Sequence, residues 1–304
     1  MAAATSPQFR LKDLPARVGV TCLYGLARLP WSLQRAVGAG LGRLLMWLLP
    51  DRRRAARTNI DLCFPELDAA ARVALLRGSF RDLGIGVFEF ARAWWGDVDA
   101  MRATATIEGV DKIQSLQAQG RGVLLISGHF MTLELCGRLM CDHVPLAGMY
   151  RRYRSPVMEA AVLQGRLRYA SAMFPNDDIR GAIRHLKKGG VLWYAPDQDM
   201  RGKDTVFAPF FGIPASTINA THQLARLTGC AVIPFFHRRE GDRYILRVGD
   251  PLDPFPSDDT VVDATAVNAA IEAMVREAPM QYLWIHRRFK RQPDGVSLYQ
   301  ARAG

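Results

Sequence analysis

The chain has 304 residues, of which 49% are hydrophobic and 23% charged, a globular mixture that excludes a disordered or fibrous protein. Its 40 lysines and arginines outnumber its 29 acidic residues, and the net charge of +11 favours an anionic partner: nucleic acid, acidic lipid or an acidic carrier protein. The five cysteines form no CxxC pair, which argues against a zinc site or a disulfide framework and favours free thiols in a reducing compartment.

The first fifty residues contain two apolar stretches, Val18 to Ala27 and Leu41 to Leu49, which arginines and a proline interrupt. Neither stretch reaches the roughly 18 apolar residues of a simple spanning helix. Trp31 and Trp47 suit the depth of lipid headgroups. We therefore expect residues 1–50 to form a membrane-associated pair of helices lying in the bilayer interface; the alternative is a soluble helical subdomain whose apolar faces meet each other.

A basic run, DRRRAAR at residues 51–57, follows directly and suits contact with anionic lipid. The next predicted element is a long amphipathic helix. Asp68 is a suitable N-cap, and apolar residues from Val73 to Val87 recur at helical spacing towards Trp94.

After Gly96 short runs rich in β-formers alternate with helix-period segments. The predicted strands are Ala105–Ile107, Val123–Ser127, Val191–Ala195, Ala231–Phe236 and Tyr244–Val248. The predicted helices are Thr132–Met140, Pro156–Arg168, Asp178–Lys187, Ser216–Leu227 and Asp263–Arg276. This alternation predicts an α/β fold with a mixed, mainly parallel central sheet flanked by helices, in one catalytic domain over residues 51–304.

The segment VLLISGHFMTLELCGR (123–138) combines a buried strand, a turn with His129 and a helix that carries Glu134. Side chains at the end of a strand in such a sheet occupy the usual position of a functional site. If His129 lies in the turn, Glu134 in the first helical turns can fold back and hydrogen-bond to one imidazole nitrogen. The other nitrogen would then be free to take a proton from an alcohol.

Other reaction classes lose support because their motifs are missing. The chain has no HExxH zinc motif, no GxSxG elbow, no P-loop and no GxGxxG after a strand. A non-catalytic nucleic-acid-binding or membrane-scaffold protein is an alternative of another class. It would need basic residues interleaved with exposed aromatics, or a recognition helix, and neither is apparent.

Six ordered blocks make the sequence resemble the lipid A late acyltransferase family, the lauroyl and myristoyl transferases of Gram-negative bacteria. They are GHFMTLELCGR (128–138), MYRRYRSPVME (149–159), QGRLR (164–168), LKKGGVLWYAPDQD (186–199), VFAPFFGIPAST (206–217) and APMQYLWIHRRFKRQPDG (278–295). The resemblance covers nearly the whole chain from residue 59. It departs from the family pattern at Arg152, where proline is common, and around Met200 to Lys203.

The resemblance implies catalytic roles for four residues. His129 would be the general base and Glu134 its orienting partner. Arg166 would stabilise the oxyanion of the acyl-transfer intermediate, and Asp197 would hold Arg166 or the His129–Glu134 dyad in place. Basic and aromatic residues near the site would bind phosphorylated substrate or acidic carrier, and these are Tyr150, Arg151, Arg152, Arg154, Arg287 and Arg288.

The resemblance further implies an enzyme of the cell inner membrane, on its cytoplasmic face. It would take a fatty acyl group from the phosphopantetheine thioester of acyl carrier protein and place it on a hydroxyl of a lipid A precursor. No metal and no cofactor would be needed, and nucleic acid would not be a partner. The alternative is the same chemistry on another membrane glycolipid or lipid acceptor.

Overall fold

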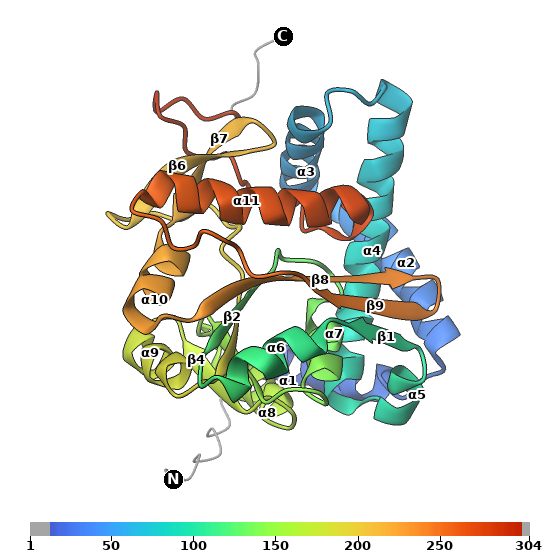
Figure 1. Ribbon diagram of the computed structural model, residues 1–304. Helices are drawn as coiled ribbons and strands as arrows, with labels where there is room; N and C mark the ends of the chain where they lie inside the picture. Colours follow the sequence, from blue (N-terminus) through green and yellow to red (C-terminus); the bar gives the residue numbers. More distant parts are fainter. Residues whose placement is uncertain (1–12, 300–304) are drawn as a thin grey trace.

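The computed structural model describes residues 13–299, and in this part of the chain helices cover both faces of a seven-stranded sheet (Figure 1). The strands are β1 (Ala105–Glu108), β2 (Val123–Ile126), β3 (Leu146–Tyr150), β4 (Ala172–Pro175), β5 (Val191–Tyr194), β8 (Ala231–Glu240) and β9 (Arg243–Val248). A separate hairpin is formed by β6 (Thr205–Phe210) and β7 (Ile213–Ile218). The helices are α1 (Leu14–Leu26), α2 (Trp31–Leu48), α3 (Pro50–Cys63), α4 (Ala69–Trp95), α5 (Val98–Arg102), α6 (Val110–Ala118), α7 (Leu133–Met140), α8 (Pro156–Arg166), α9 (Ile179–Lys187), α10 (Ala220–Thr228), α11 (Thr260–Glu277) and the short 3₁₀ helix η2 (Pro279–Gln281).

The strand order is β1-β9-β8-β2-β5-β3-β4. All neighbouring pairs are parallel except β8 and β9, which form an antiparallel hairpin. The central strand β2 consists of the run Val123–Ile126, which is completely buried because both faces of the sheet are covered. The mixed, mainly parallel sheet predicted from the sequence is therefore confirmed.

Alternate residues of the strands enter two separate hydrophobic cores. Leu124 and Ile126 of β2 pack in the core beneath α11 and α10, while Val123 and Leu125 pack against α6 and α7. The result is a three-layer arrangement in which the ends of the central strands open towards α4.

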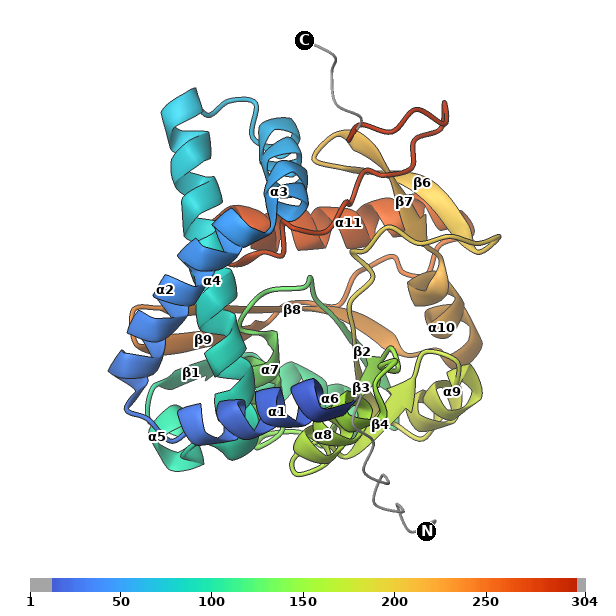
Figure 2. The ribbon, with the colours of Figure 1, turned by 180° about the vertical axis from the view of Figure 1, so that it is seen from behind.

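Helix α2 packs on α4 at very short range, as Figure 2 shows from behind. The contact is made by glycines: a Cβ added to Gly42 would lie 2.1 Å from the carbonyl oxygen of Phe80, and one added to Gly84 would lie 2.1 Å from that of Gly38. Larger residues would separate the two backbones. The long helix α4 begins as predicted at Asp68, whose carboxylate accepts a hydrogen bond from the backbone N–H of Ala71 (2.7 Å).

The outward side of α2 is apolar and exposed, with Leu33, Val37, Leu44, Trp47 and Leu48. Trp47 is 73% exposed. Within residues 13–299, no helix combines the length and the hydropathy needed to cross a membrane. The division into residues 1–50 and 51–304 stays a prediction.

The five predicted strands and five predicted helices are present, with one error. Residues 216–218 belong to strand β7 and not to the predicted helix, which begins at Ala220. The two-residue loop Phe211-Gly212 has φ values of 52° and 74°, so the chain turns back tightly and pairs β7 with β6. Strands β3, β4, β6 and β7 and helices α3, α5 and α6 were not predicted.

Candidate active site

His129 and Asp197 meet because their strands are neighbours. His129 follows β2 by three residues and Asp197 follows β5 by three residues. Strands β2 and β5 are parallel and in register, with Ile126 beside Tyr194. The two side chains therefore emerge together at the carboxyl edge of the sheet, where a functional site in an α/β fold is expected.

The Asp197 carboxylate holds His129 at two points. One oxygen lies 2.5 Å from Nδ1 of the imidazole, and the other accepts the backbone N–H of His129 at 2.8 Å. The Tyr282 hydroxyl also helps to lower the pKa of Asp197. Asp197 is buried, whereas the His129 side chain is 31% exposed. No hydrogen bond within residues 13–299 occupies Nε2 of His129, so this nitrogen is available to a substrate.

The Asp197 contact changes the protonation equilibria of both groups. Burial acts to lower the pKa of His129, but the charge and hydrogen bond of Asp197 outweigh it and raise that pKa above its ordinary value of 6.5. Burial acts to raise the pKa of Asp197, yet the His129 contacts hold it well below 3.8. Asp197 is therefore a fixed negative charge that stabilises an imidazolium.

Glu134 does not contact His129, so the predicted His129–Glu134 dyad is wrong as a hydrogen-bonded pair. Glu134 lies in the first turn of α7 and points towards α8, where Arg166 approaches it with Nε (2.9 Å) and Nη2 (2.7 Å). The indole N–H of Trp94 and the hydroxyl of Tyr169 also donate to it. The first turn of α7 directs the Glu134 side chain away from the loop that contains His129. The partner of His129 is instead Asp197, in the loop after β5.

The Glu134–Arg166 pair is buried and charged. Burial acts to raise the pKa of Glu134, but Arg166, followed by Trp94 and Tyr169, holds it below its ordinary value of 4.5. Burial acts to lower the pKa of Arg166, but Glu134 raises it. Two parallel N–H donors fix the plane of the guanidinium, and no partner within the described chain occupies its Nη1.

Both pairs border one groove of about 700 Å³, which we call the main groove. His129, Glu134 and Arg166 line it, and most of its remaining wall is apolar, from Leu83, Val87, Phe90, Trp95, Met131 and Leu283. The exposed edge of His129 thus faces a space with largely apolar walls, to which Arg166 also presents its guanidinium. Among the described residues, no group of three or more His, Cys, Asp or Glu side chains could hold a metal ion.

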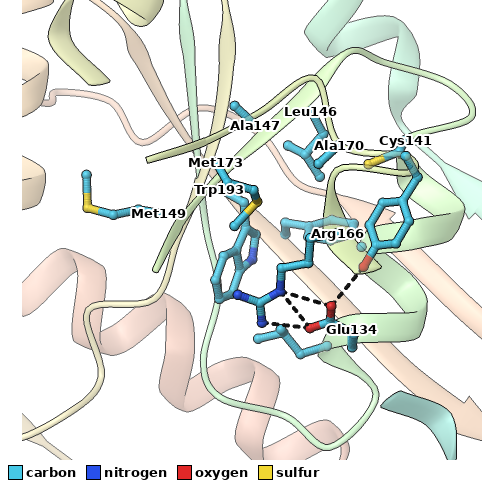
Figure 3. A pocket seen from close by; sticks show the side chains of 14 residues that line it. Glu134, Cys141, Leu146, Ala147, Met149, Arg166, Ala170, Met173 and Trp193 are labelled. Carbon is cyan, nitrogen blue, oxygen red and sulfur yellow. Dashed lines mark hydrogen bonds and ion pairs between the residues drawn. The ribbon is translucent and has the colours of Figure 1, made fainter. Parts of the chain in front are cut away.

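A smaller side pocket of about 60 Å³ adjoins the main groove behind the Glu134–Arg166 pair. Figure 3 shows this pair facing each other next to Trp193, with Ala147 and Ala170 further in. Apart from Glu134, Arg166 and Tyr169, the lining of the side pocket is almost entirely apolar. The side pocket therefore suits the end of a hydrocarbon chain.

The structure separates the predicted substrate-binding residues into two groups. Tyr150, Arg151, Arg152 and Arg154 line the main groove, as Arg166 does. Arg287 and Arg288 do not line it. Arg288 is 3% exposed and donates to the backbone oxygen of Ser216 and to the side chains of Thr217 and Asn268, so it joins β7 to α11. Arg287 is exposed and lies over the ring of Tyr299.

Three functional candidates were not found from the sequence. Trp94 and Tyr169 donate hydrogen bonds to Glu134, and Tyr282 helps to lower the pKa of Asp197. Each aromatic residue lies far along the chain from its partner, so only the ends of α4 and α8 and the segment after α11 bring them to the site. The one indication in the sequence of such a role was that Tyr282 lies in an apolar run near the end of the chain.

Comparison with known proteins shows the family to which the chain belongs. Residues 7–291 match the model of the family described as bacterial lipid A biosynthesis acyltransferase. The chain is 38% identical to a lipid A biosynthesis lauroyltransferase of Escherichia coli (strain K12), over 92% of each chain. It is 36% identical to the palmitoleoyltransferase of the same strain, again over 92% of each, and 26% identical to its myristoyltransferase, over 94% of this chain and 90% of the relative. The chain therefore belongs to the bacterial lipid A biosynthesis acyltransferase family.

Proposed function

We propose that this protein moves a fatty acyl group from the thioester of acyl carrier protein to a hydroxyl of a lipid A precursor. Membership of the family establishes acyl transfer in lipid A biosynthesis. The observation that carries the finer proposal is the main groove, in which a histidine with a free Nε2 faces an apolar channel beside a fixed guanidinium. An acyl chain needs the apolar walls, and a proton transfer needs the histidine.

In the proposed mechanism His129 Nε2 takes the proton of the acceptor hydroxyl while the hydroxyl oxygen attacks the thioester carbon. A carbon–oxygen bond forms, and the carbonyl oxygen becomes an oxyanion. The carbon–sulfur bond then breaks, and the leaving thiolate of the phosphopantetheine arm takes the proton from the imidazolium. Asp197 stabilises the imidazolium between these two steps because its charge lies against Nδ1.

Arg166 is the proposed oxyanion partner. Its Nη1 is free within the described chain, and its other nitrogens are bound to Glu134. A guanidinium fixed in this way needs no reorganisation when charge develops, and such a donor contributes about 3–4 kcal/mol to catalysis. Glu134 is then a positioning residue for Arg166, not for His129.

The basic mouth of the main groove suits the anionic substrates. Arg151 and Arg154 are exposed, and no carboxylate pairs with either within the described residues. A phosphorylated lipid and an acidic carrier protein both require such donors. The mechanism uses no metal and no cofactor, because the phosphopantetheine thioester enters as part of a substrate, and it uses no nucleic acid.

We place the protein at the cytoplasmic face of the inner membrane, with α1 and α2 in the lipid interface. The exposed apolar side of α2, with Leu44, Trp47 and Leu48, supports this placement. Val20 and Leu23 of α1 line the main groove, so a lipid acceptor would enter it from the same side.

The test is a mass-shift assay on the full chain in lipid vesicles. The substrates are acyl carrier proteins loaded with chains of different length and a tetraacylated lipid A precursor that carries the sugar acid Kdo. We expect a product heavier by one acyl group, no product with His129→Ala, and a normal rate with the matched control His143→Ala. His143 is exposed and lies outside the main groove.

Three results would change the proposal. An unchanged rate in His129→Ala would remove His129 as the base. Transfer from acyl carrier protein to another lipid but not to the lipid A precursor would keep the chemistry and change the acceptor. Transfer from acyl-coenzyme A but not from acyl carrier protein would change the donor.

A further inference from the structure

A second groove, of about 550 Å³, lies between α2, α4 and η2; we call it the arginine groove. Gly78 of α4 lines it, whereas Val87 of α4 lines the main groove. Nine residues of α-helix turn through about 900°, or two and a half turns, so these residues lie on opposite sides of α4. The arginine groove is therefore separate from the proposed reaction site.

Three arginines line this groove: Arg43 from α2, and Arg77 and Arg81 from α4. All three are exposed, and none makes an ion pair or hydrogen bond within residues 13–299. The carboxylate next to them in sequence, Asp82, faces inward and is bound to Arg239 (2.8 Å). The three guanidinium groups thus surround one hollow with their donors unused, which is the arrangement that binds phosphate.

The floor of the arginine groove is apolar. Met46 and Met280 form it with Gly78, where a Cβ would lie 2.5 Å from the sulfur of Met280. Two methionine side chains offer a free phosphate ion nothing to bind. A phospholipid carries acyl chains close to its phosphate, and these can pack against the methionines. The groove also adjoins the exposed apolar side of α2, because Arg43 is followed by Leu44 and Trp47.

We propose that the arginine groove binds the phosphate headgroup of an anionic glycerophospholipid of the bilayer, with the start of an acyl chain on the methionines. This inference rests on the proposed membrane attachment through α2 but concerns a different site from the main groove. The bound lipid would fix the position of α2 and α4 in the membrane surface, while α2 inserts its apolar side beside it.

The test compares the full-length double variant Arg77→Gln/Arg81→Gln with a matched double variant, Arg180→Gln/Arg184→Gln. Both pairs are exposed and four residues apart on a helix, so the charge change is the same. Binding is measured by flotation with vesicles of phosphatidylcholine alone and with one fifth phosphatidylglycerol. Each basic residue at an anionic surface contributes about fivefold in affinity, so we expect a loss of about 30-fold in the first variant on the anionic vesicles. The matched variant should stay within about threefold of the wild type.

A second measurement identifies the ligand directly. Native mass spectrometry of the protein in detergent with added phosphatidylglycerol should show one retained lipid in the wild type and in the matched variant. The adduct should be lost in Arg77→Gln/Arg81→Gln. Inorganic phosphate at 10 mM should not displace the lipid.

Several outcomes would overturn the inference. Equal losses in both double variants would mean a general effect of charge, and displacement by inorganic phosphate would mean a site for the free ion. A raised KM for the acceptor in detergent micelles, with vesicle binding unchanged, would assign the groove to the substrate. If the wild type binds no vesicles but transfers acyl groups in micelles, then membrane attachment and this inference fail while the proposed chemistry stands.

Discussion

Replacing Asp197 by asparagine tests which residue orients His129. The carboxylate now accepts from two donors of His129, the backbone N–H and Nδ1–H, at 2.8 and 2.5 Å. An asparagine has the same shape but one acceptor oxygen and one NH₂ donor. If its oxygen faces the backbone N–H, then its NH₂ faces Nδ1 and favours the tautomer with the proton on Nε2. That tautomer cannot accept a proton from a hydroxyl at Nε2.

The expected loss follows from this change of tautomer. A positioned general base contributes a factor of about 10²–10⁴ to the rate. Asp197→Asn should therefore lower kcat by about 10²–10⁴, which corresponds to about 3–5 kcal/mol of barrier. KM for the acyl donor should change little, because Asp197 is buried and does not line the main groove.

The assay is kcat and kcat/KM against pH for wild type, Asp197→Asn and Glu134→Gln, with circular dichroism as a check on folding. Glu134→Gln should lower kcat because Arg166 loses its anchor, but it should leave the pH at which His129 titrates nearly unchanged. Wild-type kcat in Asp197→Asn would refute the reasoning. So would a pH profile that shifts in Glu134→Gln and not in Asp197→Asn.

Four further predictions concern pH, chain length and packing. Since Asp197 raises the pKa of His129 above 6.5, kcat/KM should rise with pH through that raised pKa as the base loses its proton. The stability from protonated His129 should be complete below pH 6.5 and be lost as pH rises through the folded pKa, as urea titrations at several pH values would show. Ala170→Leu should fill the side pocket and lower kcat/KM for the longest accepted acyl donor by about tenfold, since two displaced methylenes are worth about 1.6 kcal/mol, while shorter donors keep their rates. Gly84→Ala should cost about 2–3 kcal/mol of unfolding free energy, because its Cβ would meet the backbone of α2, whereas Gly40→Ala, with open space around it, should cost nothing in thermal melts.

The sequence was informative where a local pattern decides the structure. The uninterrupted apolar run Val123–Ile126 identified the central strand, and Asp68 marked the start of α4. Two of the missed strands lack such a pattern: β3 contains Gly148, and β4 ends at Pro175. Whether these segments form strands depends on the strands that lie beside them in the sheet. A local sequence pattern does not show which strands those are.

The sequence named four residues that the fold brings together, but it did not give their pairing. His129, Glu134, Arg166 and Asp197 do gather at one edge of the sheet. Their partners are set by which strands are adjacent: β2 and β5 are neighbours although 64 residues lie between Ile126 and Val191. A spacing of five residues suggested a His129–Glu134 bond, and the direction of the first turn of α7 determined otherwise.

The glycine contact between α2 and α4 has a consequence for the proposed attachment to the membrane. Helix α4 supplies both the backbone on which α2 rests and the groove wall that contains Leu83, Val87 and Phe90. With the two helices in backbone contact, neither can tilt without the other. If α2 lies in the bilayer as proposed, the depth of Trp47 would therefore set the height of the groove opening, so that a hydroxyl at one level of the acceptor is presented to His129 and hydroxyls at other levels are not.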